Sequence, residues 1–183
     1  PKVNGPEYLD EVSALLDEGG APDSTRIWAM VETPVGILEV GRIAQHERMA
    51  VMVMGTNDMA KELRATITPD RQALLPHLAK CLLSARAANK AILDGVYNDI
   101  KDDAGFASVC RQGAQMGFDG KTLIHPNQVA PTNDIFSPSL DELDFHQRVI
   151  EEFETAEKEG RGVLTVDGKM IENLHVEEAR RAL

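Results

Sequence analysis

The sequence predicts an α/β fold built on a parallel sheet, and two observations indicate it. Short apolar stretches of strand length alternate along the chain with longer stretches that have helical periodicity. The strand-length stretches are apolar without alternation, as in strands that are buried on both faces. This order is typical of a doubly wound sheet or a (β/α)8 barrel. The chain has no GxGxxG and no Walker motif, which disfavours the nucleotide-binding forms.

Each predicted strand ends where polar or turn-forming residues interrupt an apolar run. The four strands are expected at residues 27–31, 50–54, 91–96 and 121–124. The run "AVMVM", for example, has no polar residue and stops at "GTND". Because helical stretches separate the runs, neighbouring strands are expected to be parallel rather than joined by hairpins.

The predicted helices begin at capping residues and end at glycines. Pro6 opens the first, Gly19 closes it, and Thr33 caps a helix with Pro34 at its first position and Leu38 and Ile43 facing inward. The others are expected over 59–65, from Thr68 to about Ala85 with a kink at Pro76, from about Asp103 to Gly117, and over about 140–158.

Composition excludes several classes of partner. The 183 residues are 43% hydrophobic and 27% charged, which is ordinary for a soluble domain. The net charge of −11 disfavours nucleic acid and anionic membranes as partners. No apolar run has membrane-spanning length, and no signal peptide opens the chain. Cys81 and Cys110 lie in helical patterns and are expected to be reduced core residues, in keeping with a cytoplasmic protein.

Polar side chains follow each of the four predicted strands. The carboxyl ends of parallel strands share one edge of a sheet, where ligands bind in α/β proteins. Glu32 and Asp58 follow consecutive strands, so their carboxylates are expected to converge. Two carboxylates with open surroundings suit Mg²⁺, which keeps several waters. Alternatively, both carboxylates only stabilise the N-termini of the helices that follow them.

Seven motifs, in this order, resemble the HpcH/HpaI aldolase and citrate lyase β-subunit family, which includes malyl-CoA lyases and malyl-CoA thioesterases. They read "PKV", "AMVETPVGILE", "VMGTNDMAKEL", "DGVYND", "GFDGKTLIHPNQV", "IFSPS" and "VDGKMIENLHVEEA". The resemblance implies a (β/α)8 TIM barrel, of which residues 1–160 supply the C-terminal half, from the end of strand 4 to strand 8. Residues 161–183 then form a C-terminal lid. A further half barrel is expected before Pro1.

The resemblance also implies roles for individual residues. Glu32 and Asp58 would hold Mg²⁺, or Mn²⁺ in its place. Glu32, Gly55 and Thr56 would contact a keto acid, because a glycine and a helix N-terminus allow close approach of a carboxylate. Ile124 and His125, at the end of the last predicted strand, would contact the thioester or the pantetheine arm.

Glu172 would act as the catalytic acid or base in the lid. Many lyases of the family carry an aspartate at this position, which acts across a subunit boundary. The side chain here is one methylene longer than that aspartate. The alternative is that Glu172 only begins the last helix, where a carboxylate suits the helix dipole.

The resemblance implies a Mg²⁺-dependent carbon–carbon lyase acting on a β-hydroxyacyl-CoA thioester of the malyl-CoA, citramalyl-CoA or citryl type. The motifs are close to the malyl-CoA thioesterase branch, so a thioester hydrolase is the first alternative. A non-catalytic subunit or metal-binding scaffold is the second. The expected partners are a CoA thioester, a keto acid and further copies of the chain, in trimers or hexamers.

Overall fold

The computed structural model describes all residues, 1–183, and they form two compact units. The first unit is Pro1–Phe136 and the second is Ser137–Leu183. None of the helices in either unit has the length and apolar character needed to cross a membrane.

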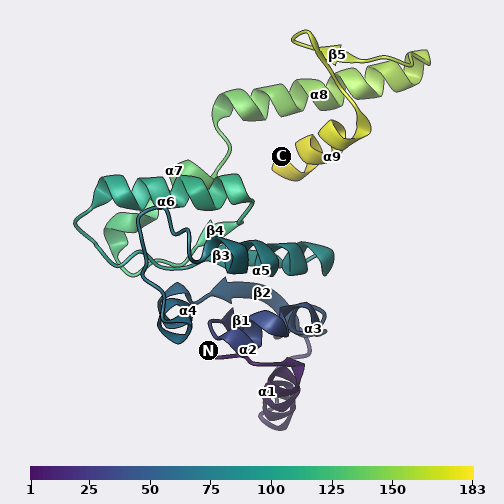
Figure 1. Ribbon diagram of the computed structural model, residues 1–183. Coiled ribbons are helices and arrows are strands. Elements are labelled where there is room, and N and C mark those ends of the chain that lie inside the picture. Colours follow the sequence, from purple (N-terminus) through teal and green to yellow (C-terminus); the bar gives the residue numbers. More distant parts are fainter. The chain divides into compact units, whose positions relative to one another are not determined.

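The first unit is built on a four-stranded parallel sheet with the strand order β1-β2-β3-β4. Its strands are β1 (Ile27–Val31), β2 (Met49–Met54), β3 (Ala91–Asp94) and β4 (Gly120–Lys121). Along the chain they alternate with helices, as Figure 1 shows from purple to green. The prediction of an α/β fold with a parallel sheet is therefore confirmed.

The helices of the first unit start and stop at local sequence signals. They are α1 (Pro6–Glu18), α2 (Pro34–Leu38), α3 (Val40–Ala44), α4 (Thr56–Leu63), α5 (Leu75–Ala87), α6 (Asp103–Met116), the 3₁₀ turn η1 (Pro126–Gln128) and α7 (Val129–Phe136). Thr33 caps α2 as predicted, because its Oγ1 accepts the Gly36 N–H at 3.0 Å. Gly117 ends α6 with a φ of 100°, a left-handed conformation that favours glycine.

A single hydrophobic core joins the sheet to its helices. Its fully buried members come from the strands, from the inward faces of α1, α3, α4 and α5, and from the residue before α5; the largest are Leu9, Ile43, Met49, Met52, Met54, Met59, Leu74, Leu78 and Ile92. Burying such side chains is the main favourable term in folding. Ile43 faces inward as predicted, but Leu38 is 73% exposed, so the prediction for Leu38 is wrong.

The helix predicted from Thr68 begins only at Leu75. Pro76 therefore lies in the first turn, where a missing N–H costs nothing, and the predicted kink is absent. The segment before it turns through Arg71, whose φ of 55° is left-handed and cannot continue a helix. Packing of the Arg71 side chain, described below, holds this conformation.

Two strands are shorter than predicted. β3 ends at Asp94 rather than Val96, and β4 includes only Gly120 and Lys121 of the range that was expected to reach Ile124. β4 is the last strand of the sheet and pairs with β3 alone, through Leu93–Gly120 and Asp94–Lys121. Because β3 ends at Asp94, the last backbone bond between the two strands is that of the Thr122 N–H, which donates to the Asp94 carbonyl at 3.0 Å.

The second unit is a long helix with a folded tail packed on it. It consists of α8 (Leu140–Glu159), an antiparallel hairpin of β5 (Thr165–Val166) and β6 (Lys169–Met170), and α9 (Asn173–Ala182). Val149 and Ala156 of α8 share a core with Leu164, Val166, Ile171, Val176 and Ala179. Residues 161–183, the range predicted for a lid, belong to the compact unit that begins at Ser137, because their hydrophobic partners lie on α8.

Candidate metal centre

Glu32 is a buried carboxylate at the carboxyl end of β1. Glu32 is only 4% exposed, and its Oε1 accepts a hydrogen bond from the backbone N–H of Lys2 at 2.8 Å. The first residues of the chain run beside β1, since the Val3 N–H donates to the Met30 carbonyl at 3.2 Å. This pairing brings the Lys2 backbone to Glu32, so the carboxylate has a partner although it is buried.

Asp58 lies in the first turn of α4, directly after β2. Its Oδ1 accepts a hydrogen bond from Lys2 Nζ at 2.8 Å, and both side chains are partly exposed. This ion pair lowers the pKa of Asp58 and raises that of Lys2. Lys2 thus contacts both carboxylates, through its backbone at Glu32 and its ammonium group at Asp58.

One cavity of about 210 Å³ contains both carboxylates. Its walls come from the carboxyl ends of the strands and the start of α4: Met30, Glu32, Met54, Gly55, Thr56, Asn57, Asp58, Val96 and Thr122. The structure therefore brings together Glu32, Gly55, Thr56 and Asp58, four residues that the sequence predicted for the site. It adds Thr122, which lay inside the last predicted strand and was therefore not singled out from the sequence; Thr122 Oγ1 donates to the Asp94 carbonyl at 3.1 Å.

Ile124 and His125, predicted to contact the thioester arm, do not line this cavity. Ile124 is exposed, and its backbone N–H donates to Gln128 Oε1 at 3.1 Å. His125 Nδ1 accepts the Asn127 N–H at 3.2 Å and caps η1. In this unit both residues serve to shape the turn after β4.

The donor set of Glu32 and Asp58 fits a hard divalent cation. Lys2 occupies one oxygen of each carboxylate, which leaves Glu32 Oε2 and Asp58 Oδ2. No group of three or more His, Cys, Asp or Glu side chains is arranged to hold a metal. A structural zinc site needs about four such ligands, whereas Mg²⁺ often takes one or two carboxylates and keeps its waters. The pair therefore suits Mg²⁺ or Mn²⁺.

Glu172 lies in the second unit, at the residue that precedes α9. Its side chain is exposed, and its backbone N–H donates to His175 Nδ1 at 2.9 Å. Of the two residues expected to anchor it, Ile171 is buried in the core of the unit and Met170 is exposed. Anchoring of Glu172 thus depends on Ile171 and on the start of α9.

A buried ion cluster at the ends of β3 and β4 was not predicted. Arg71 Nη1 donates to both oxygens of Asp94 at 2.8 Å, and Lys121 Nζ donates to Asp94 Oδ2 at 3.0 Å. Burial lowers the pKa of Lys121, and Asp94 opposes that shift. The apolar pattern around each residue gave no signal for the cluster, because its members come from three separate segments of the chain.

Comparisons with known proteins identify relatives for the whole chain. Residues 1–126 match the model of the family described as HpcH/HpaI aldolase/citrate lyase. A protein named (3S)-malyl-CoA thioesterase from Cereibacter sphaeroides is 50% identical over 183 residues, which cover 100% of this chain and 62% of the relative. The citrate lyase subunit beta of Escherichia coli is 36% identical over 166 residues, which cover 90% of this chain and 55% of the relative.

Two solved structures share the fold. The protein CitE from Mycobacterium tuberculosis, in complex with magnesium, acetoacetate and coenzyme A, has a TM-score of 0.74 at 24% identity, over 100% of this chain and 65% of that one. A citrate lyase from Burkholderia xenovorans has a TM-score of 0.84 at 16% identity, over 100% of this chain and 60% of that one. The chain thus spans 62% of the length of the thioesterase that it matches.

Proposed function

The chain belongs to the HpcH/HpaI aldolase/citrate lyase family, and on that basis we propose that it is part of a Mg²⁺-dependent enzyme that hydrolyses a malyl-CoA-type thioester. The observation that supports a hydrolase most directly is the 50% identity to a malyl-CoA thioesterase over all 183 residues. The carboxylate pair of Glu32 and Asp58 supports the role of a divalent cation.

We propose further that the parallel sheet is part of a (β/α)8 barrel. Its strands follow one another in sequence order, without the reversal that defines a doubly wound sheet. Crossovers between parallel strands are right-handed, so a sheet with this order carries its connecting helices on one face. The opposite face then becomes the interior of a barrel, and ligands bind at the carboxyl ends of the strands.

In the proposed site each residue has a distinct task. Glu32 and Asp58 would hold Mg²⁺, and Lys2 orients both carboxylates. When bound, Mg²⁺ would polarise a carbonyl oxygen and stabilise negative charge on it. The first backbone N–H groups of α4, at Thr56 and Asn57, have no partner within the helix and favour a substrate carboxylate.

Hydrolysis consumes one water and releases two products. The water oxygen adds to the thioester carbonyl carbon, the C–S bond breaks, and the proton from water ends on the departing sulfur. Malyl-CoA and water thus yield malate and free CoA. We propose Glu172 as the residue that takes this proton and returns it, because a carboxylate in a closing lid can complete a site.

A carbon–carbon lyase is the second candidate. The 36% identity to a citrate lyase subunit beta favours it, and stabilising negative charge on oxygen would serve this reaction equally well. Cleavage of malyl-CoA yields acetyl-CoA and glyoxylate, without water. Ile124 and His125 remain proposed contacts of the CoA arm in either reaction, and a cytoplasmic trimer or hexamer remains the proposed assembly.

The test of function separates the products. The chain is incubated with (3S)-malyl-CoA and Mg²⁺, and free CoA and glyoxylate are measured in parallel. Release of CoA without glyoxylate supports the hydrolase. Formation of glyoxylate with acetyl-CoA overturns it in favour of the lyase. Formation of neither product would leave a metal-binding subunit without activity of its own.

The test of the metal site uses Mn²⁺ as a spectroscopic probe. Glu32→Gln and Asp58→Asn should each abolish Mn²⁺ binding measured by electron paramagnetic resonance, because either change removes one of two charged ligands. Asp103→Asn is the matched control, since Asp103 is an exposed carboxylate in the first turn of another helix, α6. Unchanged binding in both site variants would overturn the metal assignment.

A further inference from the structure

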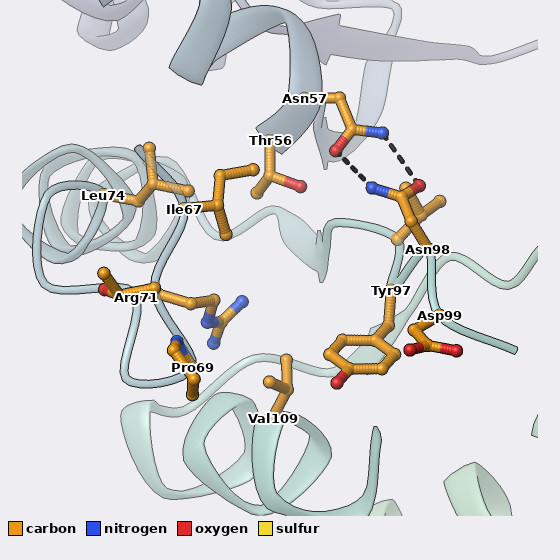
Figure 2. A pocket seen from close by; sticks show the side chains of 12 residues that line it. Thr56, Asn57, Ile67, Pro69, Arg71, Leu74, Tyr97, Asn98, Asp99 and Val109 are labelled. Carbon is orange, nitrogen blue, oxygen red and sulfur yellow. Dashed lines mark hydrogen bonds between the residues drawn. The ribbon is translucent and has the colours of Figure 1, made fainter. Parts of the chain in front are cut away.

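A second cavity of about 210 Å³ adjoins the first, and Thr56, Asn57 and Val96 line both. Residues of the loop before α5, the loop after β3 and α6 complete its walls: Ile67, Thr68, Pro69, Arg71, Leu74, Val96, Tyr97, Asn98, Asp99 and Val109. Asn57 and Asn98 face each other across its edge through two amide hydrogen bonds, of 3.0 and 2.8 Å (Figure 2). Apart from Thr56 and Asn57, none of its lining residues has a task in the function proposed above.

The guanidinium of Arg71 extends into this second cavity. Figure 2 shows it between the side chains of Ile67 and Val109. Arg71 is only 5% exposed, and two of its nitrogens have partners: Nη1 donates to Asp94, and Nε donates to Gln112 Oε1 at 2.7 Å. The third nitrogen, Nη2, is buried and has no partner. A buried donor without an acceptor costs free energy, so this group favours a ligand that accepts a hydrogen bond.

The charges beneath the cavity favour an anion. Arg71 and Lys121 both pair with the single carboxylate of Asp94, which leaves one positive charge in excess. Asp102 is already engaged by the Tyr97 hydroxyl at 2.6 Å, and Asp99, on the rim, is exposed to solvent. An anion at Nη2 would therefore meet a buried excess of positive charge, while the acidic groups nearby are exposed or occupied.

The rest of the lining is largely apolar. We define the apolar wall as the four aliphatic side chains Ile67, Leu74, Val96 and Val109. Sites for drug-sized ligands have volumes of about 300–1,000 Å³, so this cavity suits a smaller molecule. Its ligand should combine a short aliphatic part with one acidic group.

We propose that the second cavity binds a small aliphatic carboxylate, with one oxygen accepting a hydrogen bond from Arg71 Nη2 and the carbon chain against the apolar wall. A planar guanidinium matches the geometry of a carboxylate better than an ammonium group would. Such a ligand would satisfy the one unpartnered nitrogen and neutralise the excess charge of the ion cluster. The site requires no metal, so it is separable from the function proposed above.

Butyrate is the probe, and methyl NMR is the measurement. The full chain is labelled at Ile, Leu and Val methyl groups and titrated with butyrate in the absence of divalent cations. The methyl signals of the apolar wall should shift and saturate, while those of Val149 and Val176, in the core of the second unit, should not move. Absence of saturable shifts in the apolar wall would overturn the proposal.

Two variants test the contacts separately. Ile67→Phe fills the cavity without removing a charge of the ion cluster and should weaken butyrate binding about tenfold or more; Ile100→Phe is its control, since both residues are 44% exposed and Ile100 lies outside the cavity. Arg71→Met removes the donor and the excess charge but leaves Asp94 paired with Lys121, and should weaken binding about tenfold or more.

Butyramide tests the role of charge, because it has nearly the same shape as butyrate and is neutral. It should bind at least about tenfold more weakly than butyrate. Equal affinity for both probes, or unchanged butyrate binding in Ile67→Phe, would overturn the proposal. Either result would leave the metal site untouched, because Mn²⁺ binding depends on other residues.

Discussion

Gly55 lies against the side chain of Glu32: a Cβ atom on Gly55 would be 2.3 Å from Glu32 Oε2 and 2.4 Å from Glu32 Cβ. Contacts below 3.0 Å essentially never occur for real Cβ atoms, so with any larger residue either Glu32 or the backbone at position 55 must shift. Gly55 is held in place by its N–H, which donates to the Val31 carbonyl at 3.1 Å. The position of Glu32 therefore depends on a glycine at the end of the neighbouring strand.

Gly55→Ala should weaken divalent cation binding by about 10–100-fold, the usual cost of disturbing a residue that orients a metal ligand. Calorimetric titration with Mn²⁺ measures the change. Gly41→Ala is the control, because its added Cβ meets no atom within 4 Å and Gly41 lies in α3. Ala is a better helix former, so the control should gain up to about 1 kcal/mol of stability with unchanged affinity. Equal affinities in both variants would contradict the prediction.

Lys2→Met should raise the pKa of Asp58 towards its ordinary value, because the hydrogen bond and charge of Lys2 are the main causes that lower it. The pKa of Asp58 is depressed in the folded state. The ion pair therefore stabilises the fold above the unfolded pKa of about 3.9 and loses this effect as the pH falls through the folded value. Carboxyl NMR titration of Asp58 measures the shift.

The same variant should bind Mn²⁺ more tightly, since the positive charge of Lys2 beside Asp58 repels a cation bound at the other carboxylate oxygen. Lys61→Met provides the comparison. Lys61 acts on Asp58 through charge alone, so its removal should have a smaller effect on both the pKa and the affinity. If Lys61→Met changed the pKa or the Mn²⁺ affinity as much as Lys2→Met or more, the prediction that Lys2 is the main partner of Asp58 would be wrong.

Asp94→Asn should destabilise the first unit by about 3–5 kcal/mol, the cost of breaking a buried ion pair from one side. Arg71 and Lys121 would then be two buried cations without a carboxylate. Urea unfolding measures the loss. Glu7→Gln removes an exposed ion pair with Arg42 and should leave the unfolding midpoint nearly unchanged. A similar midpoint for the two variants would refute the prediction.

Glu172→Gln should lower turnover of malyl-CoA by roughly 100-fold or more, the usual scale for losing a general acid or base. The melting temperature should hardly change, because the side chain is exposed. Glu178→Gln, an exposed substitution within α9, is the control and should keep full turnover. Near-normal turnover in Glu172→Gln would show that Glu172 has no part in catalysis and serves only at the start of α9.

Cys81 and Cys110 should resist thiol reagents at pH 8 in the folded protein. Both are buried, and burial raises the pKa of Cys81 to about 12 and that of Cys110 above its ordinary value. Thiolate is the reactive form, so almost none is present. Labelling with and without urea, followed by mass measurement, should detect modification only after unfolding; rapid labelling of native protein would contradict this.

The sequence by itself determined those features that depend on neighbouring residues. Thr33 and Pro34 start α2, and Gly117 ends α6, through contacts within one turn of helix. The apolar runs predicted the parallel sheet, and their ends placed Glu32 and Asp58 at one edge of it. Such signals are readable because the physical cause and its effect lie a few residues apart.

Only the tertiary structure decided which distant side chains meet. Lys2 contacts Asp58 across 56 positions of sequence, and Arg71 contacts Asp94 across 23. The start of α5 also depended on this packing, because the loop must turn at Arg71 before Pro76 can enter a helix. Local periodicity carries no information about such pairs, since their energy arises only when folding buries the charges and removes the water that would otherwise solvate them.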